Sequence, residues 1–169
     1  MKVLLKRIRE RGSYLEEGID VVHLTKSLSQ RPRGRACIVF THNYLEQKTW
    51  AAELAKRAGA GHLHLLDTFA DDERFSENVG AFSVNDLFRF FTENGNDPIL
   101  IVSGLEFLKA TWLGQASVLE QFARQVEMWD KKPALLIVMQ YDRFLETRKF
   151  ERFKQYPFVI DQRDTLALT

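Results

Sequence analysis

The sequence predicts an α/β fold, a three-layer sandwich in which helices cover both faces of a five-stranded parallel sheet. Two observations favour this class. From residue 36 onward, short apolar runs alternate with stretches of helical periodicity, and the apolar runs are nearly continuous. A strand buried on both faces shows such a run, and parallel strands need crossover connections, which are usually helices. The predicted strands are 36–41, 62–67, 98–104, 133–140 and 157–161.

The segments between these strands carry the signals of helices. Residues 47–58 have small and apolar side chains at helical spacing, and Gly59 ends that stretch. Ser83 is placed to cap a helix that closes at Gly95, with Asp86 three residues after the cap as in a capping box. The remaining segments are a polar loop at 68–82, a helical stretch at 105–129 that Gly114 can break or bend, and a charged helix at 142–155.

The chain is expected to form one main domain. A length of 169 residues is enough to bury a sizeable core, and 45% hydrophobic with 28% charged residues is typical of a globular protein rather than a disordered one. Residues 1–34 are expected to form a basic, helical extension ahead of an α/β domain at 35–169. No apolar run reaches the roughly 18 residues of a membrane span, so a cytoplasmic protein without an export signal is expected.

The overall charge, the single cysteine and the histidines argue against several kinds of site. A formal net charge of +1 does not favour binding of nucleic acid by the chain as a whole. Cys37 lies in the first apolar run without a second cysteine, so a buried structural thiol is expected. His62 and His64 share one face of the second strand and could share a metal ion, but no third ligand stands at motif spacing. No metal site is predicted.

Polar residues follow the carboxyl ends of the predicted strands, where parallel α/β proteins bind their ligands. The stretch HNYLEQKTW, residues 42–50, follows the first strand and opens the next helix. Further positions of this kind are Asp67, Ser103, Gly104, Glu106, Gln140 and Asp142. This edge of the sheet is therefore the predicted site.

The arrangement resembles the P-loop ATPases of the RecA and AAA+ type over residues 36–161. In that family a phosphate-binding loop, Walker A, follows strand one, the Walker B acid ends strand three, and a polar sensor residue ends strand four. Against the pattern G-x-x-x-x-G-K-[ST], this sequence has His42, Gln47, Lys48 and Thr49, so two of four positions match. The resemblance implies a P-loop topology, with Ser103 at the Walker B position and Gln140 at the sensor position.

The departures from the family pattern argue against nucleotide chemistry. Glycines let successive backbone N–H groups turn toward a phosphate and keep side chains out of the cradle. His42 and Gln47 replace both glycines. Ser103 replaces a carboxylate that would hold Mg²⁺, and a hydroxyl is a weaker partner for that ion. Glu106 or Asp67 could supply the missing acid.

We therefore expect a P-loop-like accessory subunit that does not hydrolyse nucleotide and docks onto a protein partner in a larger bacterial complex. The short P-loop protein of BREX-type phage-defence loci and recombinase-like proteins without the glycines are similar, which implies phage defence or DNA transactions. No cofactor is expected in this interpretation. The alternative is an active or nucleotide-sensing ATPase that uses ATP and Mg²⁺, with Lys48 on the phosphates, Thr49 on the metal and Glu106 or Asp67 as the acid.

A second alternative is an accessory protein that binds nucleic acid. Basic residues gather ahead of the first strand and in residues 143–156, where arginines alternate with aromatic residues. Such a mixture suits a protein interface or stacking on a nucleic acid, although basic side chains most often form a solvated helix face. The candidate contacts are Arg31, Arg33, Arg35, Arg148, Lys149 and Arg152.

Overall fold

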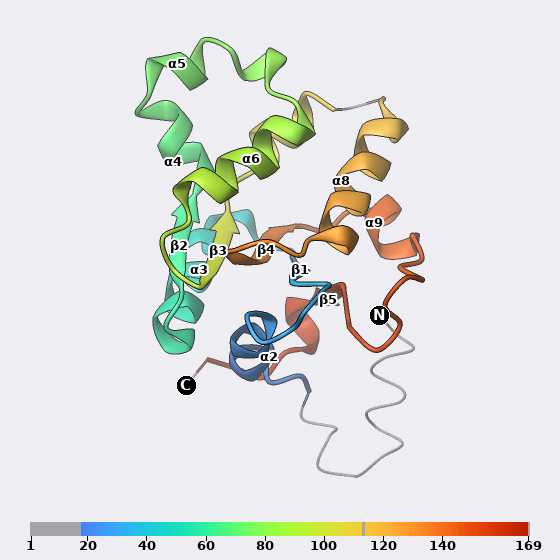
Figure 1. The fold of residues 1–169 in the computed structure, drawn as a ribbon. Coiled ribbons are helices and arrows are strands. Elements are labelled where there is room, and N and C mark those ends of the chain that lie inside the picture. Colours follow the sequence, from blue (N-terminus) through green and yellow to red (C-terminus); the bar gives the residue numbers. More distant parts are fainter. Residues whose placement is uncertain (1–17, 113, 169) are drawn as a thin grey trace.

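The core of the molecule is a five-stranded sheet with helices against both faces (Figure 1). The computed structural model describes residues 18–112 and 114–168. All strand pairs are parallel, and the strand order is β2-β3-β4-β1-β5. The strands are β1 (Ala36–Thr41), β2 (Gly61–His64), β3 (Ile99–Ser103), β4 (Ala134–Gln140) and β5 (Val159–Asp161). This confirms the predicted α/β class with its five-stranded parallel sheet.

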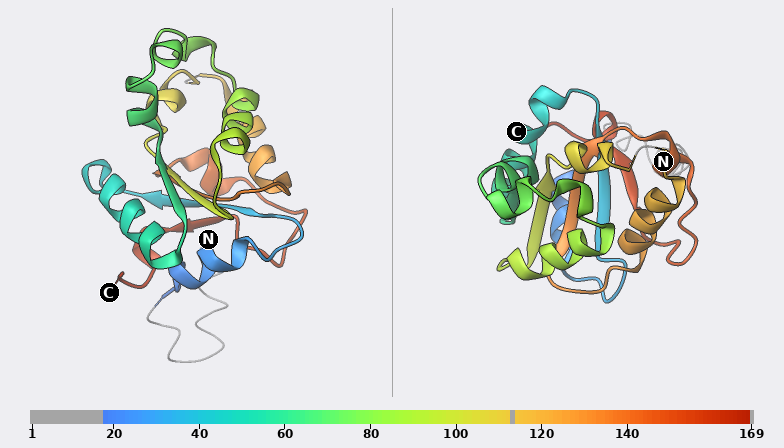
Figure 2. Two further views of the ribbon diagram at one scale, coloured as in Figure 1. Left: turned by 60° about the vertical axis from the view of Figure 1, so that its left-hand side comes forward. Right: turned by 90° about the horizontal axis from the view of Figure 1, so that it is seen from above.

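Alternate residues of the central strands point into two separate cores, because successive side chains of a strand face opposite sides of the sheet. Cys37 and Val39 of β1 pack in the core under α2 (Val21–Leu28) and α3 (Tyr44–Ala58). Ile38 and Phe40 of the same strand pack in the core under α6 (Val84–Asn94) and α8 (Ala116–Met128). Two helical layers therefore enclose the sheet (Figure 2). Burial raises the pKa of the Cys37 thiol to about 12, in line with a structural role.

The segment between β2 and α6 differs from the prediction. The predicted strand 62–67 ends at His64, which pairs with Ser103, the last residue of β3, so a longer strand would have no neighbour. The end of that predicted strand and the predicted loop 68–82 instead form α4 (Leu65–Ala70), α5 (Glu73–Ser76) and the 3₁₀ turn η2 (Val79–Ala81), which extend away from the sheet (Figure 2). A phenylalanine cluster holds this excursion together, with Phe69 at the centre of contacts to Phe75, Phe82, Phe90 and Phe107.

The predicted helical stretch 105–129 is two helices, α7 (Glu106–Ala110) and α8. Gly114 lies between them with φ of 76°, a left-handed conformation that interrupts a helix. The predicted helix 142–155 is also too long, because α9 covers only Arg143–Thr147. After it, Phe150 and Phe153 pack on Phe158 beside the core, and that packing replaces helical hydrogen bonding.

The two ends of the described chain lie side by side. Ile19 forms a parallel β-bridge with Thr165, just after β5 and the 3₁₀ turn η3 (Gln162–Asp164). Of the predicted extension 1–34, residues 1–17 lie outside the described part, and α2 packs against α3 and the sheet. Among the described helices, none has the length and apolar character needed to cross a membrane.

Candidate functional site

The strand order places the predicted site at a point where connections leave in opposite directions. The chain leaves β1 for β2 at one edge of the sheet, while it leaves β4, the neighbour of β1, for β5 at the other edge. Such a switch point opens a crevice at the carboxyl ends of the strands. Thr41 and Gln140 end the two strands and pair with each other in register. The residues after them surround this crevice.

The Gln47 side chain fills the centre of the crevice. It is 1% exposed, and its amide oxygen accepts a hydrogen bond of 2.8 Å from the Gly104 N–H. Its amide nitrogen donates to Thr41 Oγ1 at 3.2 Å and to Glu106 Oε2 at 3.3 Å. The residue at the second glycine position of the phosphate-loop pattern is thus a buried polar link between β1, β3 and α7.

Glu106 anchors α7 to the end of β4. Its Oε2 accepts a hydrogen bond of 2.8 Å from the Gln140 backbone N–H, in addition to the bond from Gln47. Among the described residues, its Oε1 is the one buried side-chain oxygen or nitrogen that has no hydrogen-bond partner. Glu106 therefore has one free acceptor position inside the site.

Protein atoms also cap the N-terminus of α3, where a phosphate loop would present its amides. Asn43 Oδ1 accepts from the Leu45 N–H at 3.1 Å. With its nitrogen turned toward Thr41, the Gln140 amide donates to Thr41 O and Oγ1 at 2.8 and 2.7 Å, and its oxygen accepts from the Tyr44 N–H at 3.1 Å. The first amides of α3 are therefore bonded within the protein.

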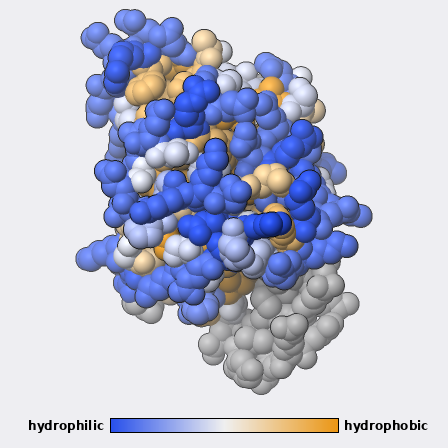
Figure 3. Space-filling model, in the orientation of Figure 1, coloured by the Kyte–Doolittle hydropathy of each residue, from blue (hydrophilic) through white to orange (hydrophobic). Residues whose placement is uncertain are grey.

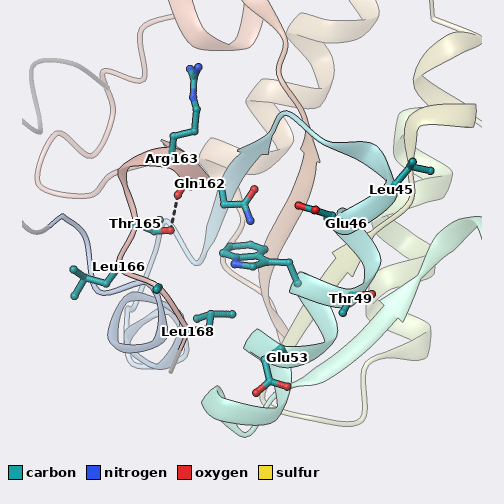
Figure 4. A pocket seen from close by; sticks show the side chains of 11 residues that line it. Leu45, Glu46, Thr49, Glu53, Gln162, Arg163, Thr165, Leu166 and Leu168 are labelled. Carbon is teal, nitrogen blue, oxygen red and sulfur yellow. Dashed lines mark hydrogen bonds between the residues drawn. The ribbon is translucent and has the colours of Figure 1, made fainter.

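Lys48 and Thr49 point away from the crevice in different directions. The Lys48 ammonium forms an ion pair with the Asp67 carboxylate on α4, and this hydrogen bond holds the pKa of Asp67 below its usual value. Thr49 lies on the outer face of α3, opposite the segment after β5 (Figure 4). Successive residues of a helix are about 100° apart, so once Gln47 is buried Lys48 lies at the side of α3 and Thr49 on its outer face.

The end of β3 carries a chain of hydrogen bonds between side chains of β2 and Ser103. His62 Nε2 lies 2.8 Å and His64 Nδ1 2.7 Å from Ser103 Oγ, which is fully buried. Because a hydroxyl donates one hydrogen, one imidazole accepts it and the other donates an N–H. Burial lowers the pKa of both histidines, and the charge of His64 lowers that of His62 further. Ser103 is thus engaged within the sheet.

His42 binds the end of β5 instead of facing a phosphate. Its Nε2 lies 2.7 Å from Asp161 Oδ2, and its ring stacks on Tyr141 with 5.7 Å between ring centroids. Burial raises the pKa of Asp161, but hydrogen bonds from Arg163 and His42 outweigh it, so the pKa is lowered overall. Both candidate glycine positions therefore hold side chains that bind neighbouring elements.

Several of the basic residues proposed for nucleic acid are engaged within the protein. Arg31 is 8% exposed, stacks on Tyr156 and donates to the Gly34 carbonyl oxygen at 3.1 Å. Arg148 forms ion pairs with Glu120 and Glu127 of α8. Arg35 donates to the carbonyl oxygens of Ser29, Arg31 and Lys131, whereas Arg33, Lys149 and Arg152 are exposed.

The structure brings six of the predicted residues close to one another. Four of them lie at the crevice: Gln47, Ser103, Glu106 and Gln140. The other two, Lys48 and Asp67, form an ion pair beside it. Sequence reasoning missed Asp161 as the partner of His42, although Asp161 ends a predicted strand and could have been included on that ground. It also missed the shared bonding of the two histidines to Ser103. The alternation of histidine and leucine in β2 gave their common face but not the register with β3.

We infer the function of the chain from this geometry. The chain matches no protein-family model and no curated protein.

Proposed function

We propose that the protein is a P-loop-like accessory subunit that does not hydrolyse nucleotide and docks onto a partner protein in a larger complex. The observation that carries this proposal is the buried Gln47 amide, which occupies the crevice between β1, β3 and β4. A buried amide that bonds Gly104, Thr41 and Glu106 is a structural link, and its removal would leave several polar groups without partners.

A bound triphosphate does not fit the groups at the start of α3. Phosphate binding at a helix N-terminus needs free backbone N–H groups. Here the Leu45 and Tyr44 N–H groups are bonded to Asn43 and Gln140. Glu46, in the first turn of α3, adds a negative charge that repels phosphate. The residues present thus favour a closed, protein-bonded helix start over a nucleotide cradle.

Exposed apolar side chains at the same edge favour docking of a partner protein. Among the described residues, five large apolar side chains are exposed, and four of them follow the carboxyl ends of strands: Tyr44, Leu45, Leu66 and Tyr141. Aromatic residues are enriched in protein interfaces, and an exposed apolar group rimmed by polar residues is typical of a binding surface. Leu45, at 88% exposure, is the most open of them.

One observation supports the alternative of a nucleotide-sensing protein. The unpaired Oε1 of Glu106 is a buried carboxylate oxygen, and carboxylate oxygens are ligands that Mg²⁺ prefers. Lys48 could reach a phosphate only by leaving Asp67. This alternative therefore needs a rearrangement of α3, and a binding measurement decides it.

The first test is titration of the full chain with a fluorescent ATP analogue and Mg²⁺. We expect no saturable binding up to about 1 mM, which corresponds to a binding free energy weaker than about −4 kcal/mol. The variants Lys48→Ala and Lys56→Ala should behave alike, since Lys56 is an exposed lysine of the same helix outside the crevice. Micromolar binding that Lys48→Ala abolishes and Lys56→Ala retains would establish the nucleotide-binding alternative.

The second test concerns docking. The protein isolated from its native host should carry a partner in fixed stoichiometry, identified by mass spectrometry. Leu45→Asp should release that partner, while Met128→Asp, which changes an exposed residue of α8, should retain it. A chain that purifies alone, or a partner lost equally in both variants, would contradict docking at this edge.

A further inference from the structure

A groove of about 680 Å³ runs along the outer face of α3, next to the crevice. The segment that follows β5 forms its other wall, and Figure 4 shows the Leu168 side chain of that wall extending toward α3. Trp50 contributes an aromatic surface, and Leu45 lines the end nearest the carboxyl edge of the sheet. The groove is thus continuous with the exposed apolar side chains at that edge.

The wall opposite α3 is a built part of the fold. Ile19 N–H donates to the Asp164 carbonyl oxygen at 2.8 Å, and Leu166 N–H donates to the Ile19 carbonyl oxygen at 2.8 Å. Gly18 has φ of 111°, and a Cβ atom there would lie 2.6 Å from the Asp164 carbonyl oxygen, so this contact requires glycine. Backbone hydrogen bonds therefore hold the groove open in a defined shape.

The groove carries unbalanced negative charge on its α3 side. The Glu46 side chain is exposed and forms no hydrogen bond or ion pair within the described part of the chain. Glu53 lies two turns further along α3, with Trp50 between them, and pairs with Arg57. On the other wall, Arg163 is neutralised by Asp161. The unpaired charge that a ligand would meet is therefore the Glu46 carboxylate, with the Glu53–Arg57 ion pair beyond the Trp50 ring.

We propose that this groove binds a segment of the partner protein in which a large apolar side chain lies between lysine or arginine residues. The inference rests on the proposed docking function and names the chemistry of the docked segment. Glu46 and Glu53 are about 10 Å apart along α3, because seven residues of helix rise about 10.5 Å. In an extended segment alternate residues share a face, so basic residues at positions i and i+4 flank an apolar residue at i+2 on one side of the segment. Their backbone positions are about 13 Å apart, which long lysine or arginine side chains can adjust to the spacing of the two glutamates. The apolar residue between them would pack on Trp50, where a neighbouring cation also gains attraction to the ring.

The experiment uses two labelled peptides of about ten residues and fluorescence anisotropy with the full chain. One peptide repeats Lys-Ser-Leu-Ser, which places lysine and leucine alternately on one face of an extended chain, and the other has glutamate at every lysine position. We expect saturable binding of the lysine peptide only. Glu46→Lys should weaken it about fivefold, the upper range for an exposed ion pair, whereas Glu93→Lys makes the same charge change on α6, away from the groove, and should leave it unchanged.

Three results would overturn the inference: equal affinity for both peptides, equal weakening by the two lysine variants, or no saturation below about 1 mM. Two other occupants of the groove would give different results. Binding seen only after Lys6, Arg7 and Arg9 are changed to glutamate would assign the groove to the basic N-terminal sequence of this chain. A dimer in sedimentation that Glu46→Lys dissociates would assign it to a second copy. ATP binding is measured separately, so failure of the peptide test leaves the proposed function to its own experiments.

Discussion

Gly104 shows how a single residue serves a structural role at a position where a phosphate-binding protein would place its chemistry. Its N–H donates to Gln47, and its φ of 70° is left-handed. A Cβ atom at this position would lie 2.5 Å from Cε1 of His64, inside van der Waals contact. The glycine therefore makes room for an imidazole ring and directs an amide at the side chain that fills the crevice.

Gly104→Ala should lower the free energy of unfolding by more than Gly59→Ala, measured by urea denaturation. Both glycines have positive φ, which costs an L-residue about 1–2 kcal/mol. Only Gly104 adds a clash, since no atom lies within 4 Å of the Cβ position at Gly59. Equal losses in the two variants would show that the His64 ring moves aside freely and that its place at Ser103 is not fixed.

At the scale of elements, β2 is an edge strand held largely by its pairing with β3. It lies at the edge, pairs only with β3, and all four of its residues are partly exposed. Its side chains reach β3 through the Ser103 hydroxyl, which both histidines contact. The hydroxyl donates its one hydrogen to one of the imidazoles, so at least that imidazole must be neutral in this bonding pattern. Two protonated rings would both be donors and would repel each other.

We expect the unfolding free energy to fall between about pH 7.5 and about pH 5.5. Burial lowers the pKa of His62 and His64 in the folded state below 6.5, so the unfolded chain takes up protons first and stability is lost as pH falls through the folded values. Lys48 adds to the lowering and Asp67 opposes it, but Asp67 stays ionised throughout this range.

Urea denaturation at the two pH values measures this effect. The double variant His62→Gln with His64→Gln should lose most of the pH dependence. His23→Gln, which changes an exposed histidine of α2, should keep it. An unchanged pH dependence in the double variant would place the responsible groups elsewhere in the molecule.

At the scale of the whole molecule, half of the candidate contacts for a nucleic acid are engaged within the described part of the chain. The formal net charge is +1, and hydrophilic residues with scattered apolar ones cover the face seen in Figure 3. Arg31 is buried, with its pKa lowered by that burial, and Arg148 is bonded to two glutamates. Three of the six candidate contacts, Arg33, Lys149 and Arg152, remain exposed.

Duplex DNA should therefore bind weakly and only at low ionic strength, since phosphate contacts alone give a steep dependence on salt. We expect binding, measured by anisotropy, to vanish by about 0.15 M salt. The triple variant Arg33→Glu, Lys149→Glu and Arg152→Glu serves as the control. Binding that persists at that salt concentration and is lost in the triple variant would favour the nucleic-acid alternative.

The sequence by itself determined the sheet and the edge that carries the candidate site. Each central strand is a nearly continuous apolar run, and burial on both faces produces that pattern whatever the neighbours are, so local composition is sufficient. It also determined the interruption at Gly114 and the capping box of Ser83 with Asp86, because both depend on residues close in the chain.

Only the tertiary structure decided what the polar residues at that edge do. The length of β2 depended on where its neighbour β3 ends. The helices of residues 65–82 depended on phenylalanine contacts with α6 and α7. Periodicity within one segment reports neither of these contacts between segments. Lys48 and Thr49 match a phosphate-loop pattern, yet burial of Gln47 turns Lys48 to one side of α3 and Thr49 to its outer face. The polar groups of the crevice are hydrogen-bonded to partners that are far apart in the sequence. The physical reason is that a motif specifies residue types, whereas packing determines which of their polar groups remain free.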